Sequence, residues 1–136
     1  MSLDEQTVRR IFAGLEHGDG DAFFSHVADD VDWTVMGTHP LAGRYRSKAD
    51  FLAGTFNKLA VVLPEGAELS VENVLLDGDW AIVELRSHAI AKNGMRFDNH
   101  YCWLCRFAGQ TIVEVRAYLD SWLVNELFQE NPIGTR

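Results

Sequence analysis

The sequence predicts an α+β fold in which helices at the start of the chain cover the concave face of a curved antiparallel sheet. Apolar residues recur with helical spacing before Pro64 and alternate with a period of two from Ala67 onward. Helical spacing returns in residues 120–129, which predicts a short C-terminal helix that closes the domain. Helices gathered on one face of an antiparallel sheet are typical of this fold class.

Capping signals and apolar stripes mark three helices before the sheet. The first stripe ends at Gly18, and Asp21 can cap a second, short helix. Ser47 and Asp50 resemble a capping box that opens a third helix. The apolar run of residues 31–36, between the second and third helices, predicts a strand.

Turn signals then divide the second half of the chain into four strands. The signals are residues 77–79, 92–94 and 108–110. Strands joined by such short turns pair as consecutive hairpins, which gives an antiparallel sheet.

Composition favours one compact domain that spans residues 1–136, since 47% of the residues are hydrophobic and 24% are charged. The formal net charge of -8 argues against nucleic-acid or anionic-membrane partners, which require a basic face. The sequence shows neither a signal peptide nor an apolar run of the roughly 18 residues that span a bilayer. We therefore expect a cytoplasmic protein.

The two cysteines, Cys102 and Cys105, have C-x-x-C spacing but lie in a strand-like run. Residues three apart on a strand point to opposite faces, so the two thiols should neither pair nor share a metal. No H-x-H or H-x-x-x-H spacing and no phosphate-binding glycine loop occurs. We therefore expect no metal and no cofactor.

Alternation sorts the last strands into two faces. Asn99, Tyr101 and Trp103 share the apolar face, where a buried polar group needs a partner from the protein or from a ligand. On the preceding strand, Leu85 belongs to an apolar series that we predict to face outward and to form a homodimer interface. Its neighbours Glu84, Arg86 and His88 form either a solvated ladder or a polar cluster in a cavity.

Three motifs in this chain resemble those of the SnoaL-like proteins, the ketosteroid-isomerase-related branch of the nuclear transport factor 2-like superfamily. They are the W-x-x-x-G-x-x-P-L-A-G pattern of residues 33–43, the segment 94–101 and the G-x-x-I-x-E-x-R-x-Y-x-D pattern of residues 109–120. The resemblance covers nearly the whole chain. It implies a cone-shaped α+β barrel with a deep hydrophobic pocket, in a protein that is usually dimeric.

The family's catalytic acids have no counterparts at the aligned positions. Where ketosteroid isomerases carry the base, the tyrosine and the protonated acid, this chain has Thr34, Ile11 and Trp103. The acid that polyketide cyclases and epoxide hydrolases place in the last strand aligns with Ala117. The hydrolases also use an arginine and an aspartate one residue apart, and the Glu84–Arg86 pair lies nearby with the charges reversed.

Two further residues each have more than one interpretation. Asp120 matches an aspartate of the family but also directly precedes a helix, where it can act as an N-cap. His39, next to Pro40, could be a general base, a donor to a ligand or a solvated loop residue.

The resulting hypothesis is a protein that binds a small hydrophobic molecule without an identifiable acid–base set. The alternatives are an isomerase, cyclase or epoxide-hydrolase-like enzyme with Glu84, Arg86 and His39 as acting groups, and a structural dimer whose own aromatic residues fill the pocket. The predicted ligand-binding residues are Thr34, His39, Glu84, Arg86, Asn99, Tyr101, Trp103 and Asp120.

Overall fold

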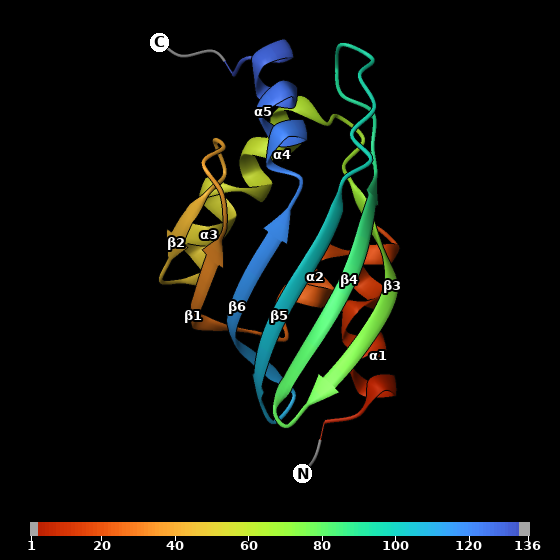
Figure 1. Ribbon diagram of the computed structural model, residues 1–136, viewed down its shortest axis with the longest axis vertical. Helices are drawn as coiled ribbons and strands as arrows, with labels where there is room; N and C mark the ends of the chain where they lie inside the picture. The colour runs from red at the N-terminus through yellow and green to blue at the C-terminus, as the bar shows by residue number, and fades with distance from the viewer. Residues whose placement is uncertain (1–2, 134–136) are drawn as a thin grey trace.

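The computed structural model describes residues 3–133, which form one curved sheet of six strands in the order β2-β1-β6-β5-β4-β3, together with five helices (Figure 1). The strands are β1 (Val27–Val35), β2 (Gly43–Tyr45), β3 (Glu68–Asp77), β4 (Trp80–His88), β5 (His100–Ala108) and β6 (Thr111–Leu119). The helices are α1 (Glu5–Glu16), α2 (Gly20–Phe24), α3 (Lys48–Gly54), α4 (Phe56–Val62) and α5 (Ser121–Glu130). In Figure 1, α1 and α2 lie behind the sheet, and α5 extends beyond the end of β6. The predicted α+β class is confirmed.

The sheet differs from the prediction in three ways, the first of which is the edge strand β2, where no strand was predicted. The consecutive strands β3 to β6 pair antiparallel as expected, but β1 lies parallel to β6. The two parallel strands are far apart in sequence and need no hairpin between them, so turn signals carry no information about their pairing. The sheet is also open, with β2 and β3 at its edges, whereas the family resemblance implied a barrel.

Side-chain caps fix the starts of most of the helices. Asp4, Asp19, Ser47 and Asp120 each accept a backbone N–H at the start of a helix. The second helix is therefore capped by Asp19 and not by Asp21 as predicted. The predicted third helix is two helices, α3 and α4, because the chain leaves helical geometry at Thr55, whose hydroxyl donates to the carbonyl of Phe51 over 2.7 Å.

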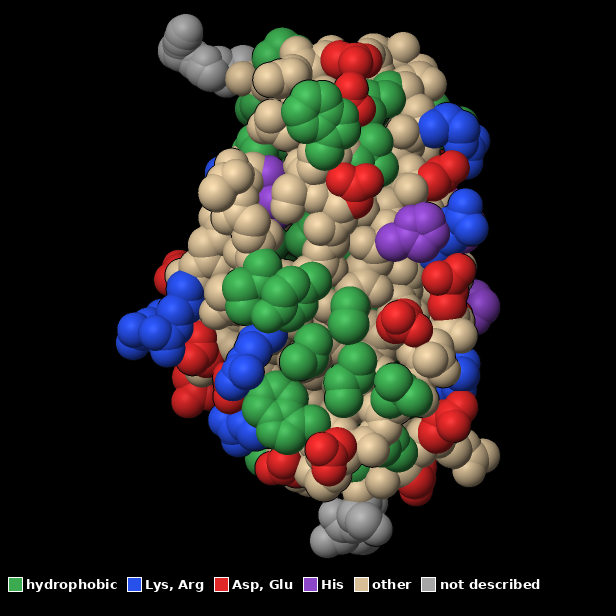
Figure 2. Space-filling view, viewed as in Figure 1, with side chains coloured by type: hydrophobic (Ala, Val, Ile, Leu, Met, Phe, Trp, Pro, Cys, Tyr) green, Lys and Arg blue, Asp and Glu red, His purple; other side chains and the backbone are tan. Residues whose placement is uncertain are grey.

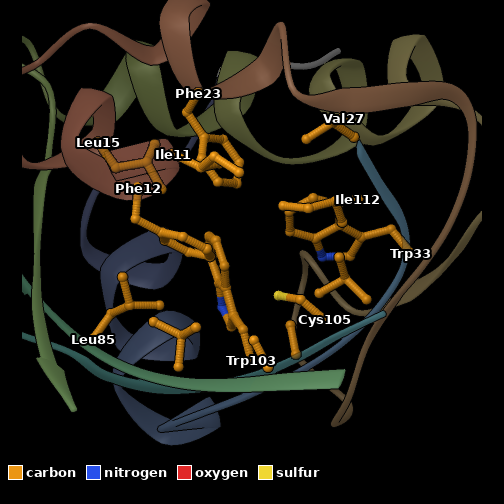
Figure 3. Close-up of a cluster of buried hydrophobic side chains, with 14 of the residues drawn as sticks. Ile11, Phe12, Leu15, Phe23, Val27, Trp33, Leu85, Trp103, Cys105 and Ile112 are labelled. Carbon is orange, nitrogen blue, oxygen red and sulfur yellow. The ribbon is translucent and has the colours of Figure 1, made fainter. Parts of the chain in front are cut away.

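An aromatic core fills the space between α1, α2, α3 and the concave face of the sheet (Figure 3). Trp33 stacks on Phe51 with a ring-centroid distance of 3.8 Å and meets Trp103 edge to face at 5.2 Å. Phe12 and Phe23 pack together at 4.9 Å and contact the other side of Trp103. Trp103 is thus enclosed by aromatic rings from the helices and from β1.

The apolar series that contains Leu85 lies in this core, so its predicted position on the outer face is wrong. Leu85 is 1% exposed and packs in the same cluster as Trp103. The other side of the sheet, here called the convex face, carries the alternate residues, including Ile82, Leu104 and Tyr118. Figure 2 shows apolar side chains gathered on this face among charged ones.

The cysteines follow the predicted geometry. Cys105 is buried in the core, whereas Cys102 is half-buried and occupies the alternate face of β5, and both are free thiols. No helix within residues 3–133 combines the length and the apolar character needed to cross a membrane.

Candidate functional site

A cavity of about 300 Å³, here called the main cavity, lies between the sheet, the end of α1 and helix α4. Its walls are mainly apolar and aromatic and include Leu15, Phe56, Leu59, Leu63, Tyr101 and Trp103. The exposed residues of its lining form its rim and lie in the turn before α2, on α4, in the loop between α4 and β3, and at the start of β3. At this rim Gly18 and Gly66 both have a φ of +75°, a conformation that favours glycine, and a Cβ at either position would meet only open space.

A smaller space of about 50 Å³, here called the inner chamber, lies against β1 and β6 and, like the main cavity, is partly open to solvent. Trp33, Val35, Ala117 and Leu119 are among its wall residues. Four side chains line both spaces: Phe56, Leu59, Tyr101 and Trp103. They form the partition between the main cavity and the inner chamber.

Of the predicted ligand-binding residues, the structure brings Tyr101 and Trp103 to the main cavity. Burial raises the pKa of Tyr101 to about 12, and the nearby Ser87 hydroxyl opposes this shift. The phenol is therefore neutral near pH 7 and can either donate or accept a hydrogen bond.

Glu84 and Arg86 lie on the convex face, so the prediction that they form a charged wall of the pocket is wrong. Leu85 between them points into the core, and neighbours on a strand face opposite ways. Glu84 is exposed and accepts a hydrogen bond from the Asn73 amide over 3.2 Å. The Nε atom of Arg86 is buried and has no hydrogen-bond partner within residues 3–133.

Asn99 is fully buried but binds the protein's own backbone. Its Oδ1 accepts the backbone N–H groups of His100 at 2.7 Å and of Asp120 at 3.0 Å, and its Nδ2 donates to the Asp120 carbonyl at 3.2 Å. Asn99 therefore ties the start of β5 to the junction of β6 and α5, and it does not reach the main cavity.

Asp120 and Thr34 also lie away from the main cavity and the inner chamber. The Asp120 carboxylate accepts the N–H of Leu123 over 3.2 Å, which is the N-cap geometry that the sequence left open as one alternative. Thr34 occupies the convex side of β1, because Trp33 and Val35 on either side of it are buried on the concave side.

His39 is 6% exposed and stabilises the loop between β1 and β2. Its Nδ1 accepts the N–H of Leu41 over 3.2 Å, so Nε2 carries the proton and donates to the Met36 carbonyl over 2.9 Å. Burial lowers the pKa of His39 and favours this neutral form. Both ring nitrogens are occupied by the backbone, and the hydrogen bond to Leu41 helps to hold that residue in the wall of the inner chamber.

We expect the contribution of His39 to stability to decrease as the pH falls below its ordinary pKa of 6.5. The unfolded chain takes up the proton first because the folded pKa is lower, so acid favours unfolding. Urea unfolding of the wild type and of His39→Gln between neutral and mildly acidic pH measures this contribution. The difference in free energy of unfolding between the two should shrink as the pH falls. A difference that is constant with pH would show that His39 is not held in its neutral form.

The charged residues that line the main cavity are Glu65 and Glu68, both exposed at its rim. Among the described residues of the lining there is no lysine, arginine or histidine. The buried walls therefore contain no strong acid or base, and their titratable group is the weakly acidic Tyr101. Such a cavity is suited to hold an uncharged aromatic molecule.

The sequence analysis did not predict that the rim residues and Leu63 line the main cavity. Gly18 was interpreted as a helix stop, and Pro64 as the end of the third helix. Both helices do end near these residues, but the segments that follow the two helices also form the rim of the main cavity. Leu63 shows no periodic signal that distinguishes a cavity wall from a filled core.

Comparison with known proteins agrees with this architecture. Residues 8–115 match the family model of the SnoaL-like domain. A dimerizing cyclase from a fungal species is 28% identical over 135 residues, which cover 96% of this chain and 59% of the relative. The chain thus spans about three fifths of that relative's length.

Solved structures show the same fold. A nuclear transport factor 2-like protein from Burkholderia thailandensis superposes with a TM-score of 0.77 at 25% identity, covering 91% of this chain and 95% of that protein. TerC, crystallised with polyporic acid, superposes with a TM-score of 0.72 at 20% identity, covering 91% of this chain and 96% of TerC.

Proposed function

This chain belongs to the SnoaL-like domain family, and we propose that it binds a small, neutral, largely aromatic molecule in its main cavity. The observation that carries the proposal is the cavity itself, whose volume of about 300 Å³ is enclosed mainly by apolar and aromatic side chains. Small-molecule sites in proteins begin at roughly this size and share this wall chemistry. The TerC complex supports the proposal, since a protein with the same fold was crystallised with a small molecule.

The ligand's aromatic body packs against Trp103 and Phe56, and the Tyr101 hydroxyl donates a hydrogen bond to one acceptor atom. A neutral phenol suits a carbonyl or ether oxygen. The two rim carboxylates and the lack of a basic residue in the described lining disfavour an anionic ligand.

The cyclase relative favours a second candidate function, the cyclisation of such a molecule. The cavity walls would then act by holding the substrate in a folded conformation, because proximity and orientation alone lower a barrier substantially. Among the described residues that line the main cavity, Tyr101, with its pKa raised to about 12, is the uncharged side chain that could polarise a carbonyl.

We expect a neutral fluorescent ketone, the propionyl derivative of dimethylaminonaphthalene, to bind in the main cavity and to quench tryptophan fluorescence. Ala60→Phe adds a ring at the cavity wall and should weaken binding at least about tenfold, which is roughly 1.4 kcal/mol. Ala53→Phe is the matched control, because Ala53 is also an exposed helix residue but does not line the cavity.

Fluorescence titration of the wild type and both variants gives the three affinities. Equal affinity in the two variants would mean that the ketone binds elsewhere on the protein. No saturable binding by the wild type would refute a site for molecules of this class.

We also propose a homodimer, now through the convex face. Apolar residues of adjacent strands lie side by side there, with Ile82 opposite Leu104. Tyr118 is 46% exposed, and Glu114 and Arg116 lie on the same strand. A face that carries apolar residues and charges of both signs can pair with a second copy of itself across a two-fold axis.

A further inference from the structure

The inner chamber lies directly behind the partition formed by Phe56, Leu59, Tyr101 and Trp103. A ligand packed against these four side chains in the main cavity is therefore one side chain away from a second empty space. The volume of this space, about 50 Å³, exceeds what a single water molecule needs.

Apart from the Tyr101 hydroxyl, the walls of the inner chamber offer no free hydrogen-bonding group to a polar substituent. They are aliphatic or aromatic apart from Thr55, whose hydroxyl already donates to the carbonyl of Phe51 over 2.7 Å. The Trp33 indole nitrogen has no hydrogen-bond partner within the described chain, but it is itself fully buried and presents no surface to the chamber. An apolar substituent placed against these walls would gain free energy, whereas a polar one would gain little.

The two halves of the partition differ in how firmly they are held. Trp103 is 4% exposed and is packed by Phe12, Phe23 and Trp33. Phe56 is also held by aromatic rings, since it packs edge to face on Phe24 with a ring-centroid distance of 5.2 Å. Leu59 is half-buried on α4, a helix of seven residues whose first turn has no side-chain cap. Half-buried side chains on a short uncapped helix change rotamer more readily than a core tryptophan.

We propose that the inner chamber is a second subsite, which takes a short apolar substituent of the ligand bound in the main cavity. Leu59 moves aside to admit the substituent, while Phe56 and Trp103 stay in place as the shared wall. This inference rests on the proposed binding function and adds the class of ligand: a neutral aromatic molecule that carries a short alkyl branch.

Ala117 sets the depth of this subsite. It pairs with Trp103 on β5 and with Val35 on β1, at the floor of the inner chamber. Its side chain ends at Cβ, so a leucine at this position would occupy the space that the alkyl branch needs.

The test uses the acetyl, propionyl and butyryl ketones of dimethylaminonaphthalene, which differ only in the length of the alkyl group. Each added methylene should tighten binding to the wild type roughly fourfold. In Ala117→Leu the three ketones should bind with equal affinity. Ala108→Leu, the same substitution at an exposed position on β5, should retain the fourfold steps.

The outcomes separate this inference from the function on which it rests. If no ketone binds, the proposed function fails. If all three bind the wild type equally, the main cavity is a binding site but the inner subsite does not exist.

A leucine at position 117 can also disturb folding. Val35→Ile adds only one methyl group to the same chamber, so it tests the inference with a smaller change to the core. It should abolish the gain from propionyl to butyryl and retain the gain from acetyl to propionyl. Retention of both gains in this variant would overturn the inference.

Discussion

Trp103→Ala should lower the free energy of unfolding by about 3 to 5 kcal/mol, the usual cost of truncating a buried aromatic residue to alanine. Trp103 is 4% exposed and contacts aromatic rings of α1, α2, β1 and β5. The truncation leaves a hole that these rings cannot fill without moving, so the transfer and cavity costs add. It also removes the shared wall between the main cavity and the inner chamber.

Trp122→Ala is the matched control for this truncation. Trp122 lies on α5 and is 70% exposed, so its loss should change the free energy of unfolding by less than roughly 0.5 kcal/mol. Urea unfolding followed by circular dichroism measures both variants without relying on tryptophan fluorescence. Similar costs for the two substitutions would show that the core is not organised around Trp103.

Leu85→Arg should prevent the chain from folding, whereas Ile82→Arg should leave the fold intact and alter only its assembly. Leu85 is 1% exposed inside the aromatic core, and burying an unpaired guanidinium there costs at least about 3 kcal/mol. Ile82 is half-buried on the convex face, where the long arginine side chain can reach water.

Circular dichroism measures whether each variant folds, and analytical ultracentrifugation measures whether it is a monomer or a dimer. Ile82→Arg is expected to have wild-type secondary structure and a monomer's mass, and the wild type is expected to sediment as a dimer. A folded, dimeric Leu85→Arg would contradict the placement of this residue in the core. A dimeric Ile82→Arg would contradict an interface on the convex face.

The pair also shows what strand alternation can and cannot predict. Alternation correctly separated Leu85 from Ile82 and placed Glu84 with Arg86. It could not say which face is inside, because both faces of β4 carry large apolar residues. The concave face is the inner one because the bulky aromatic side chains of the helices and of β5 pack there, next to smaller residues of β4 such as Ala81.

The polar residues of the predicted site were harder to place. Asn99 was rightly identified as a polar group on the apolar face, but apart from the adjacent His100 its side chain bonds to Asp120, which lies 21 residues away at the junction of β6 and α5. No local sequence pattern predicts such a long-range hydrogen bond. The main cavity is likewise a property of packing, since it exists because α4 stands away from β5 near Tyr101 and Trp103.

The family resemblance predicted a pocket but transferred no acid or base to it. The structure supplies the physical reason, because Glu84 and Arg86 lie on the convex face, Asp120 caps a helix, and mainly apolar side chains line the cavity. What the fold offers a ligand is thus shape, aromatic surface and one neutral phenol.

A crystal structure of the protein grown with the propionyl ketone tests the central claim most directly. The account expects electron density for the ketone in the main cavity, between α4 and the sheet, with its naphthalene ring against Trp103 and its carbonyl oxygen within hydrogen-bond distance of the Tyr101 hydroxyl. A cavity closed by the protein's own side chains, with the ketone absent or bound on the convex face, would contradict the account.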